Sequence, residues 1–117
     1  MSIDDCVNEF ASSAVAQHDA IWLDADARKA DQLVDKVNRA FEFLRLQGDV
    51  GRDALMRLFF DSRPEVRVSA AAYLLRHCTP EALAVLKREA AGAGMPAFQA
   101  SQAIERWKDG TWSLDPL

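Results

Sequence analysis

The stretch DSRPEVRVSAA, residues 61–71, decides the fold because it ends one helix and begins another within a few residues. Proline disfavours helical backbone angles at the residue before it, so the first helix must end before Arg63. Pro64 itself suits the first turn of a new helix. Ser62 and Glu65 have the S-x-x-E spacing of a capping box, in which each side chain accepts a hydrogen bond from the other residue's backbone N–H. We therefore expect a new helix to start directly at this turn.

The pattern around this turn occurs a second time further along the chain. Residues 53–58 (DALMRL) are matched by residues 81–86 (EALAVL), at an offset of 28. Residues 66–71 (VRVSAA) are matched by residues 98–103 (FQASQA), at an offset of 32. A helix pair of about 30 residues that is used repeatedly indicates an α-solenoid.

The other segments are helical as well. Between residues 25 and 47, apolar residues recur at steps of three and four, a spacing that places them on one face of a helix. No segment shows the period-two alternation of a strand, so the sequence predicts an all-α fold. We expect about six helices in three antiparallel hairpins, at about 3–47, 50–77 and 80–109, that form a short α-α superhelix. The apolar stripe of residues 25–47 consists of Ala30, Leu33, Val34, Val37, Ala40, Phe41 and Leu44.

Turn and cap residues mark where these helices end. Gly48 can end the helix of residues 25–47, and Asp49 can cap the next one immediately. Thr79 is expected to cap the helix that begins at residue 80, and Gly110 to end the helix of residues 96–109. Trp112 is then expected to fold back on the last turn of that helix. Residues 50–60 are so rich in apolar side chains that they should lie centrally.

At residues 61–71 the chain resembles the HEAT-repeat consensus, in which an acidic turn, a proline, a Val-Arg pair and two alanines open the second helix of each pair. The match is specific over residues 52–77. It is weaker over 80–109, where Phe98-Gln99 replaces the Val-Arg pair. With its closing W-x-x-G-x-W pattern, residues 107–112, the chain is also similar to small bacterial HEAT-like proteins grouped as a domain of unknown function. The resemblance implies a fold of stacked hairpins. It does not indicate any particular activity.

Composition and charge fit one globular domain, residues 1–117. Half of the 117 residues are hydrophobic and 27% are charged, which excludes a disordered or low-complexity chain. The net charge of -4 argues against binding through the neutralisation of many phosphates. Residues 1–27 hold six acidic and no basic residues, whereas nine basic and eight acidic residues follow from residue 50. Since neither a signal peptide nor a membrane span is evident, we predict a cytoplasmic protein with no membrane association.

No catalytic or metal-binding motif is present in the sequence. Cys6, Cys78, His18 and His77 could in number form a zinc site, but they lack C-x2-C or H-x3-H spacing. Nucleophile elbows, glycine-rich phosphate loops and H-E-x-x-H are absent. His18 precedes Asp19, but we expect an exposed histidine because consecutive side chains point apart on a helix. We therefore predict no catalytic residues, no metal site, no cofactor and no enzymatic activity.

If the second helix of each hairpin lines a groove, its outward side chains are the candidate partner contacts. Phe43 is the most informative of them, because an apolar residue within a polar helix face can mark a contact surface. Packing of Phe43 beneath a neighbouring helix is the structural alternative. For Arg67 the structural alternative is an ion pair with Asp61 or with an acid of the neighbouring repeat. The candidate residues are Arg39, Phe43, Arg63, Arg67, Arg76, Gln99, Gln102 and Arg106.

Because α-solenoids usually recognise proteins or peptides, the first functional hypothesis is a non-catalytic protein-protein interaction module with a short HEAT-like groove. Its partner would be an acidic protein or peptide, or a second copy that binds through the acidic first helix to form a homo-oligomer. An immunity-type inhibitor of a toxin is a special case. The alternative is a nucleic-acid binder of HEAT-like type, which would need a coherent basic groove with Trp107 as a stacking platform and is disfavoured by the net charge.

Overall fold

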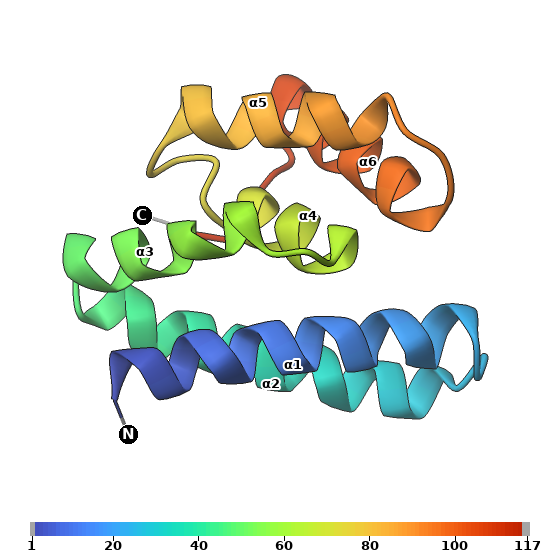
Figure 1. The fold of residues 1–117 in the computed structure, drawn as a ribbon, viewed down its shortest axis with the longest axis horizontal. Helices are drawn as coiled ribbons and strands as arrows, with labels where there is room; N and C mark the ends of the chain where they lie inside the picture. The colour runs from blue at the N-terminus through green and yellow to red at the C-terminus, as the bar shows by residue number, and fades with distance from the viewer. Residues whose placement is uncertain (1, 116–117) are drawn as a thin grey trace. The chain divides into compact units, whose positions relative to one another are not determined.

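The computed structural model describes residues 2–115, and over those residues the protein is all-α, as the sequence predicts. No strand occurs within this range. The expected domain covers residues 1–117, so residues 1, 116 and 117 of it lie outside the described residues. None of the described helices is both long and apolar enough to cross a membrane. The elements are α1 (Ile3–Trp22), α2 (Ala27–Leu46), α3 (Asp49–Met56), the 3-10 helix η1 (Arg57–Phe60), α4 (Pro64–Tyr73), α5 (Thr79–Ala90) and α6 (Met95–Asp109) (Figure 1).

The helices belong to two compact units. The first unit, Met1–Arg57, contains α1, α2 and α3, and the second unit, Leu58–Leu117, contains α4, α5 and α6. The helices α3 and α4, which were expected to form one hairpin, therefore fall into different units. The first unit has eleven acidic and seven basic residues and the second has seven of each, so the net charge of -4 lies in the first unit.

In the first unit, α1 and α2 pack against each other as an antiparallel pair (Figure 1). A capping box begins α1: the Ser2 hydroxyl accepts a hydrogen bond from the Asp5 N–H at 3.0 Å, and the Asp5 carboxylate accepts one from the Ser2 N–H at 3.3 Å. The apolar stripe predicted for residues 25–47 forms the inner face of α2. Six of its members are buried and Val34 is partly buried.

Two glycines shape the turn between α2 and α3. Gly48 has a φ of +72°, which glycine adopts without the steric penalty of a side chain. Gly48 occupies the N-cap position and Asp49 is the first residue of α3, so the prediction that Asp49 caps this helix is wrong. Gly51 is required by a close approach of backbones, since a Cβ atom there would lie 1.9 Å from the Leu44 carbonyl oxygen.

The segment after α3 differs from the expected helix over residues 50–60. The α-helix ends at Met56 and the chain continues as η1, which has about three residues per turn instead of 3.6. Side-chain directions in η1 therefore depart from those of a continuous α-helix. Leu58 and Phe59 are buried as expected, but Phe60 is 90% exposed, which corrects the prediction that the whole apolar segment is central.

The second unit begins with the turn that precedes α4. The predicted capping box between Ser62 and Glu65 is wrong, because Arg63 is the N-cap residue and no side chain caps the helix. Instead, the Asp61 carboxylate accepts a hydrogen bond from the Arg63 N–H at 2.9 Å, two residues further on. An aspartate commonly forms such a local turn. Pro64 lies at the start of α4, as predicted.

The start of α5 also differs from the prediction by one residue. Cys78 occupies the N-cap position but its side chain does not cap the helix, and Thr79 is already helical. The Thr79 hydroxyl donates a hydrogen bond to the Leu75 carbonyl oxygen, so it faces the preceding turn rather than the new helix. Because the hydroxyl bonds to this carbonyl oxygen and does not accept a hydrogen bond from an N–H group of the first turn of α5, the predicted cap is wrong.

The end of α6 agrees with the prediction. Gly110 follows the last helical residue, and the N–H groups of Thr111 and Trp112 both donate to the Arg106 carbonyl oxygen at 3.0 and 3.1 Å. The Trp112 ring folds back onto Trp107 in an edge-to-face arrangement, with 5.2 Å between ring centroids. We call residues 111–115, which follow this turn, the C-terminal strap.

Candidate partner-binding surface

The eight predicted contact residues are divided between the two units. In the first unit, α2 carries two of them. The second unit carries the other six: one at the turn into α4, one on α4, one after the end of α4 and three on α6. The two from α2 are Arg39 and Phe43, and the six from the second unit are Arg63, Arg67, Arg76, Gln99, Gln102 and Arg106.

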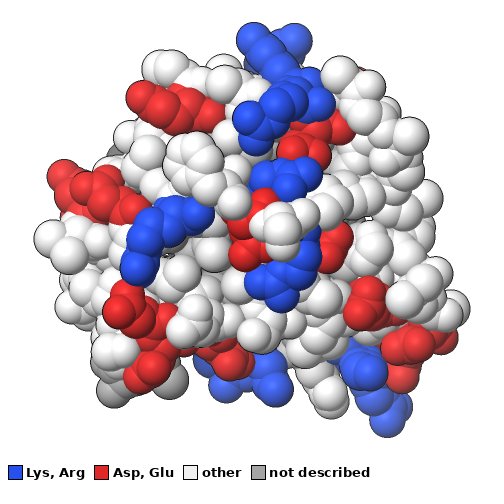
Figure 2. Space-filling view, viewed as in Figure 1, with Lys and Arg blue, Asp and Glu red and all other residues white. Residues whose placement is uncertain are grey.

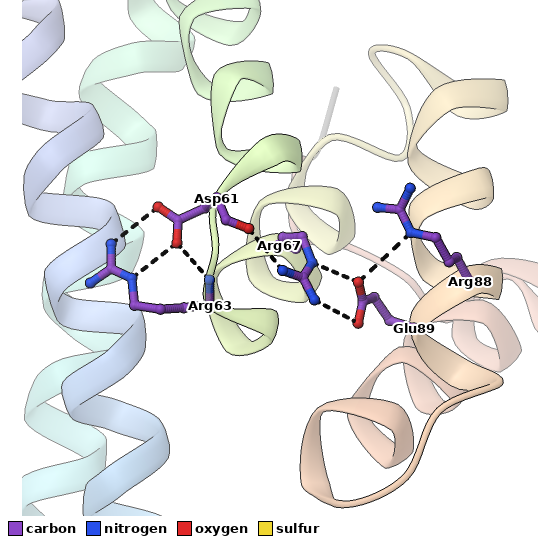
Figure 3. Close-up of polar contacts among 5 residues, drawn as sticks. All are labelled: Asp61, Arg63, Arg67, Arg88 and Glu89. Carbon is purple, nitrogen blue, oxygen red and sulfur yellow. Dashed lines mark hydrogen bonds and ion pairs between the residues drawn. The ribbon is translucent and has the colours of Figure 1, made fainter.

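Arg67 is held by an ion pair with α5. Its Nε and Nη2 atoms donate to the two carboxylate oxygens of Glu89 at 2.6 and 3.2 Å, and its Nη1 donates to the Asp61 carbonyl oxygen at 2.8 Å (Figure 3). The side chains of Arg67 and Glu89 are only 22% and 13% exposed. The hydrogen bonds that Arg67 donates to Glu89 raise the pKa of Arg67 above its ordinary value. Of the two acids expected as partners, the Arg67 side chain pairs with the one on a later helix, Glu89 of α5, and this pairing leaves Arg67 little freedom to contact a partner.

Arg63 is engaged by the carboxylate that organises its own turn. Its Nε and Nη2 atoms donate to the two oxygens of Asp61 at 2.9 and 3.1 Å (Figure 3). These hydrogen bonds hold the pKa of Asp61 below its ordinary value, although partial burial opposes the shift. A bidentate pair of this kind is geometrically specific, so the Arg63 charge is largely satisfied within the turn.

Arg76 is tied to the C-terminal strap. Its Nη2 atom lies 2.9 Å from a carboxylate oxygen of Asp115, a side chain that is 1% exposed. The strap is fixed a second time by Trp112, whose Nε1–H donates to the Ala72 carbonyl oxygen at 2.8 Å. Both contacts join the strap to the region where α4 ends. The structure thus assigns Arg76 a structural partner.

The exposed side of α6 combines two predicted residues with two apolar side chains that the prediction missed. Met95, Phe98, Gln102 and Arg106 follow one another at steps of three and four, so they lie along one side of the helix. Phe98 is 53% exposed and Met95 and Arg106 are exposed, whereas Gln102 is partly buried. We call these four residues the α6 surface. Gln99, the third predicted residue on this helix, is partly buried.

The internal repeat could have identified Phe98. At the offset of 32 residues, Phe98 takes the position of Val66, which is fully buried in the first copy. The two matched positions therefore differ in burial: Val66 is covered by neighbouring residues, whereas about half of the Phe98 side chain is exposed. The substitution is visible in the sequence, where Phe98-Gln99 replaces the Val66-Arg67 pair.

On α2, Arg39 is exposed and Phe43 is partly buried. The Arg39 Nε atom donates to the Asp35 carbonyl oxygen at 3.3 Å. Four polar residues of this helix, Asp35, Asn38, Arg39 and Glu42, line a shallow open depression. The depression has one helix as its wall, so it offers no enclosed binding site.

The two cysteines and the tyrosine show no sign of a reactive or metal-binding site within the described residues. Burial raises the pKa of the Cys6 thiol and raises that of Tyr73 to about 12, which keeps both groups protonated and unreactive near neutral pH. The Cys78 thiol lies 3.6 Å from the Leu74 carbonyl oxygen. Over residues 2–115, no group of three or more His, Cys, Asp and Glu side chains lies close enough together to hold a metal ion.

His18 differs from the expectation of an exposed side chain. It is 19% exposed, and its Nδ1 atom lies 3.5 Å from the Asp19 carboxylate. The two side chains therefore meet although they are consecutive on α1. The buried Nε2 atom of His18 has no hydrogen-bond partner.

Basic and acidic side chains lie next to one another over the face drawn in Figure 2. This agrees with the ion pairs of the second unit, where Arg63, Arg67 and Arg76 each meet a carboxylate. Within that unit, three of the four candidate contact arginines are therefore paired with carboxylates. The apolar side chains of the α6 surface, Met95 and Phe98, are in contrast substantially exposed.

No family model, curated protein or solved structure matches the chain.

Proposed function

We propose that this protein is a non-catalytic protein-protein interaction module of HEAT-like, superhelical type, and that the α6 surface is one of its contact sites. The observation that carries the proposal is the half-exposed Phe98, next to exposed Met95, on a helix whose other side is buried against its own unit. Aromatic and methionine side chains are enriched where proteins bind one another. A soluble chain gains nothing in stability from their exposure.

Recognition through apolar contact is better supported than recognition by charge. The second unit has equal numbers of acidic and basic residues, and three of its predicted contact arginines are already paired. An acidic partner would have to compete with Asp61, Glu89 and Asp115 for those arginines. For the same reason the nucleic-acid alternative receives no support, because phosphate binding needs unpaired positive charge. A cytoplasmic location is part of the proposal.

Site-specific photocrosslinking in the source cell tests the proposal. A photoreactive amino acid at Gln102, within the α6 surface, is expected to give a discrete adduct with a partner protein. Phe98→Ser should remove that adduct, because it deletes the apolar contact at the neighbouring turn of the helix. The far-UV circular dichroism should stay unchanged and the unfolding midpoint should fall only slightly, since about half of the substituted side chain is already exposed.

Phe60→Ser is the matched control, because it removes an equally large and even more exposed ring from η1. The adduct at Gln102 should persist in this variant. Persistence of the adduct in Phe98→Ser, or its absence from the parent protein, would contradict the assignment of the α6 surface. Loss of the adduct in both variants would show that general hydrophobicity, rather than this surface, determines the crosslink.

A further inference from the structure

The connection between α1 and α2 exposes two large apolar side chains. Trp22 is the last residue of α1, and Leu23 follows it at the C-cap. Leu23 is 75% exposed and Trp22 is also exposed. The connection lies at the opposite end of the α1–α2 pair from the chain's N-terminus (Figure 1). We call Trp22, Leu23 and the aspartates around them, Asp19, Asp24 and Asp26, the hairpin tip.

The hairpin tip belongs to the most acidic part of the chain. Residues 1–27 carry six acidic and no basic residues, and residues 28–57 carry five acidic and seven basic residues. The whole net charge of -4 is therefore a property of α1 and its connection, partly offset by the rest of the first unit. At this end of the α1–α2 pair, Figure 2 shows acidic side chains with basic side chains beside them.

Two of the three aspartates of the hairpin tip have clear structural roles within the first unit. Asp26 caps α2 by accepting a hydrogen bond from the Lys29 N–H at 3.0 Å, and Asp24 lies 3.6 Å from the Lys29 ammonium. Asp19 lies in the last turn of α1, where there is no lysine or arginine; its carboxylate lies 3.5 Å from the His18 Nδ1 atom and is 48% exposed. A carboxylate at the C-terminal end of a helix is disfavoured by the helix dipole, so its presence there is a local cost. A cation supplied from outside would remove that cost.

We propose that the hairpin tip is a docking site for a basic, amphipathic segment of a partner protein. Leu23 and Trp22 supply apolar contact, and the indole face of Trp22 also attracts cations such as lysine and arginine. Asp19 and the negative end of α1 favour positive charge at the same place, which explains why the segment should be basic as well as apolar. This site is separate from the α6 surface, so it does not depend on the proposed function of that surface.

Titration of the full chain with designed helical peptides of about 15 residues tests the proposal. One peptide has a leucine face and a lysine face, a second has glutamate in place of lysine, and a third has serine in place of leucine. At about 0.05 M salt, the Leu/Lys peptide should bind at least about tenfold more tightly than either other peptide. Its binding should shift the backbone amide resonances of residues 19–26. Raising the salt to about 0.3 M should weaken it.

Variants then locate the binding. Leu23→Ser should weaken the Leu/Lys peptide about fivefold or more by removing the most exposed apolar contact. The pair Asp19→Asn and Asp24→Asn should weaken it about threefold, because it removes two charges and leaves the Asp26 cap in place. The matched control is Glu81→Gln with Glu105→Gln, which removes two exposed charges from the second unit and should change the affinity less than about twofold.

Several results would overturn the proposal. Equal weakening by the two charge-removing pairs would mean that net charge alone attracts the peptide. Equal binding of the Ser/Lys peptide would mean that Leu23 and Trp22 make no contact. Amide shifts confined to other residues, or no binding at all, would remove the site. Concentration-dependent dimerisation that Leu23→Ser abolishes would assign the hairpin tip to a second copy of this chain instead.

Discussion

Arg67 shows how a single side chain can connect three segments of the second unit. It joins the turn at Asp61 and helix α4 to Glu89 of α5 through charge-assisted hydrogen bonds. From the sequence alone, an ion pair with Asp61 or with an acid of the neighbouring repeat is the structural alternative to partner contact for this residue. What the sequence left open was the choice between the two acids. The fold uses the Glu89 carboxylate and the backbone oxygen of Asp61.

Arg67→Met should destabilise the protein by about 1–3 kcal/mol, because it leaves the mostly buried Glu89 carboxylate without its principal cation. The double variant Arg67→Met with Glu89→Leu should recover much of this loss, since no unpaired charge then remains. Urea unfolding of the parent, both single variants and the double variant measures the coupling. Additive effects of the two substitutions would show that the ion pair contributes little.

Gly51→Ala should destabilise the first unit by about 2 kcal/mol or more, because the new Cβ would lie 1.9 Å from the Leu44 carbonyl oxygen and would force α3 away from α2. Gly48→Ala is the comparison. It has open space around the new atom and should cost about 1 kcal/mol, through its positive φ alone. Thermal unfolding followed by circular dichroism gives both values. An equal cost for the two variants would contradict the close approach.

Asp61 should make stability depend on pH in the acidic range. Arg63 lowers the pKa of Asp61 in the folded protein below its ordinary value of 3.8. A carboxyl group with a depressed pKa stabilises the fold above the unfolded pKa, and this contribution is lost as the pH falls through the folded pKa. Asp61→Asn should therefore be less stable than the parent at pH 6, and the difference should shrink as the pH falls below about 4.

Asp31→Asn, at an exposed position on α2, is the control for this pH dependence and should give a small difference at every pH. Asparagine at position 61 can still accept the Arg63 N–H hydrogen bond, so the comparison isolates the carboxylate charge. A difference between parent and Asp61→Asn that stays constant from pH 6 to pH 3 would refute the role of the charge.

The cap positions show where sequence reasoning failed at this scale. Ser62, Thr79 and Asp49 all have side chains that commonly cap helices, yet none of them caps one here. In each case a neighbouring group determines the turn instead. The Asp61 carboxylate accepts the hydrogen bond before α4, the Leu75 carbonyl oxygen accepts from the Thr79 hydroxyl, and Gly48 adopts the positive φ before α3. Which acceptor or turn is used depends on how the preceding segment ends, and the local sequence does not specify this.

At the scale of elements, periodicity predicted the long helices and failed at short irregular segments. The stripe of α2 follows the expected positions because twenty residues fix the phase of a helix well. Phe60 is exposed because η1 interrupts that phase after only eight residues of α3. Of the candidate contacts, the α6 positions Gln102 and Arg106 lie beside exposed apolar residues. Arg67 and Arg76 instead pair with acids that are distant in sequence, and Arg63 pairs with Asp61 in its own turn.

Trp112→Phe should destabilise the second unit by about 1 kcal/mol, because it keeps an aromatic ring beside Trp107 but removes the hydrogen bond to the Ala72 carbonyl oxygen. Hydrogen exchange should report faster opening of the strap and of the last turn of α4, and little change in α5. The control Trp22→Phe alters an exposed indole of the first unit and should leave these rates unchanged. Equal exchange rates in Trp112→Phe and parent would show that the hydrogen bond does not hold the strap.

At the scale of the whole molecule, the all-α class was predictable because it needs only the period of the apolar residues. The division into two compact units was not, because the internal repeat placed residues 53–58 and 66–71 in one helix pair and the structure assigns them to different units, apart from Leu58. The uneven distribution of charge was visible in the sequence, but the structure changes where its two parts lie. The acidic excess lies wholly in the first unit, and the second unit is neutral rather than basic.

The edge-to-face contact of Trp107 and Trp112 also gives the second unit an optical signature. Two indoles 5.2 Å apart and inclined by 80° couple their electronic transitions, so they should produce an exciton band in circular dichroism. Trp22 is the third tryptophan, and its exposure in the first unit should make its emission red-shifted and accessible to a soluble quencher. Each unit thus carries its own intrinsic chromophore, and the unfolding of each can be recorded without an added dye.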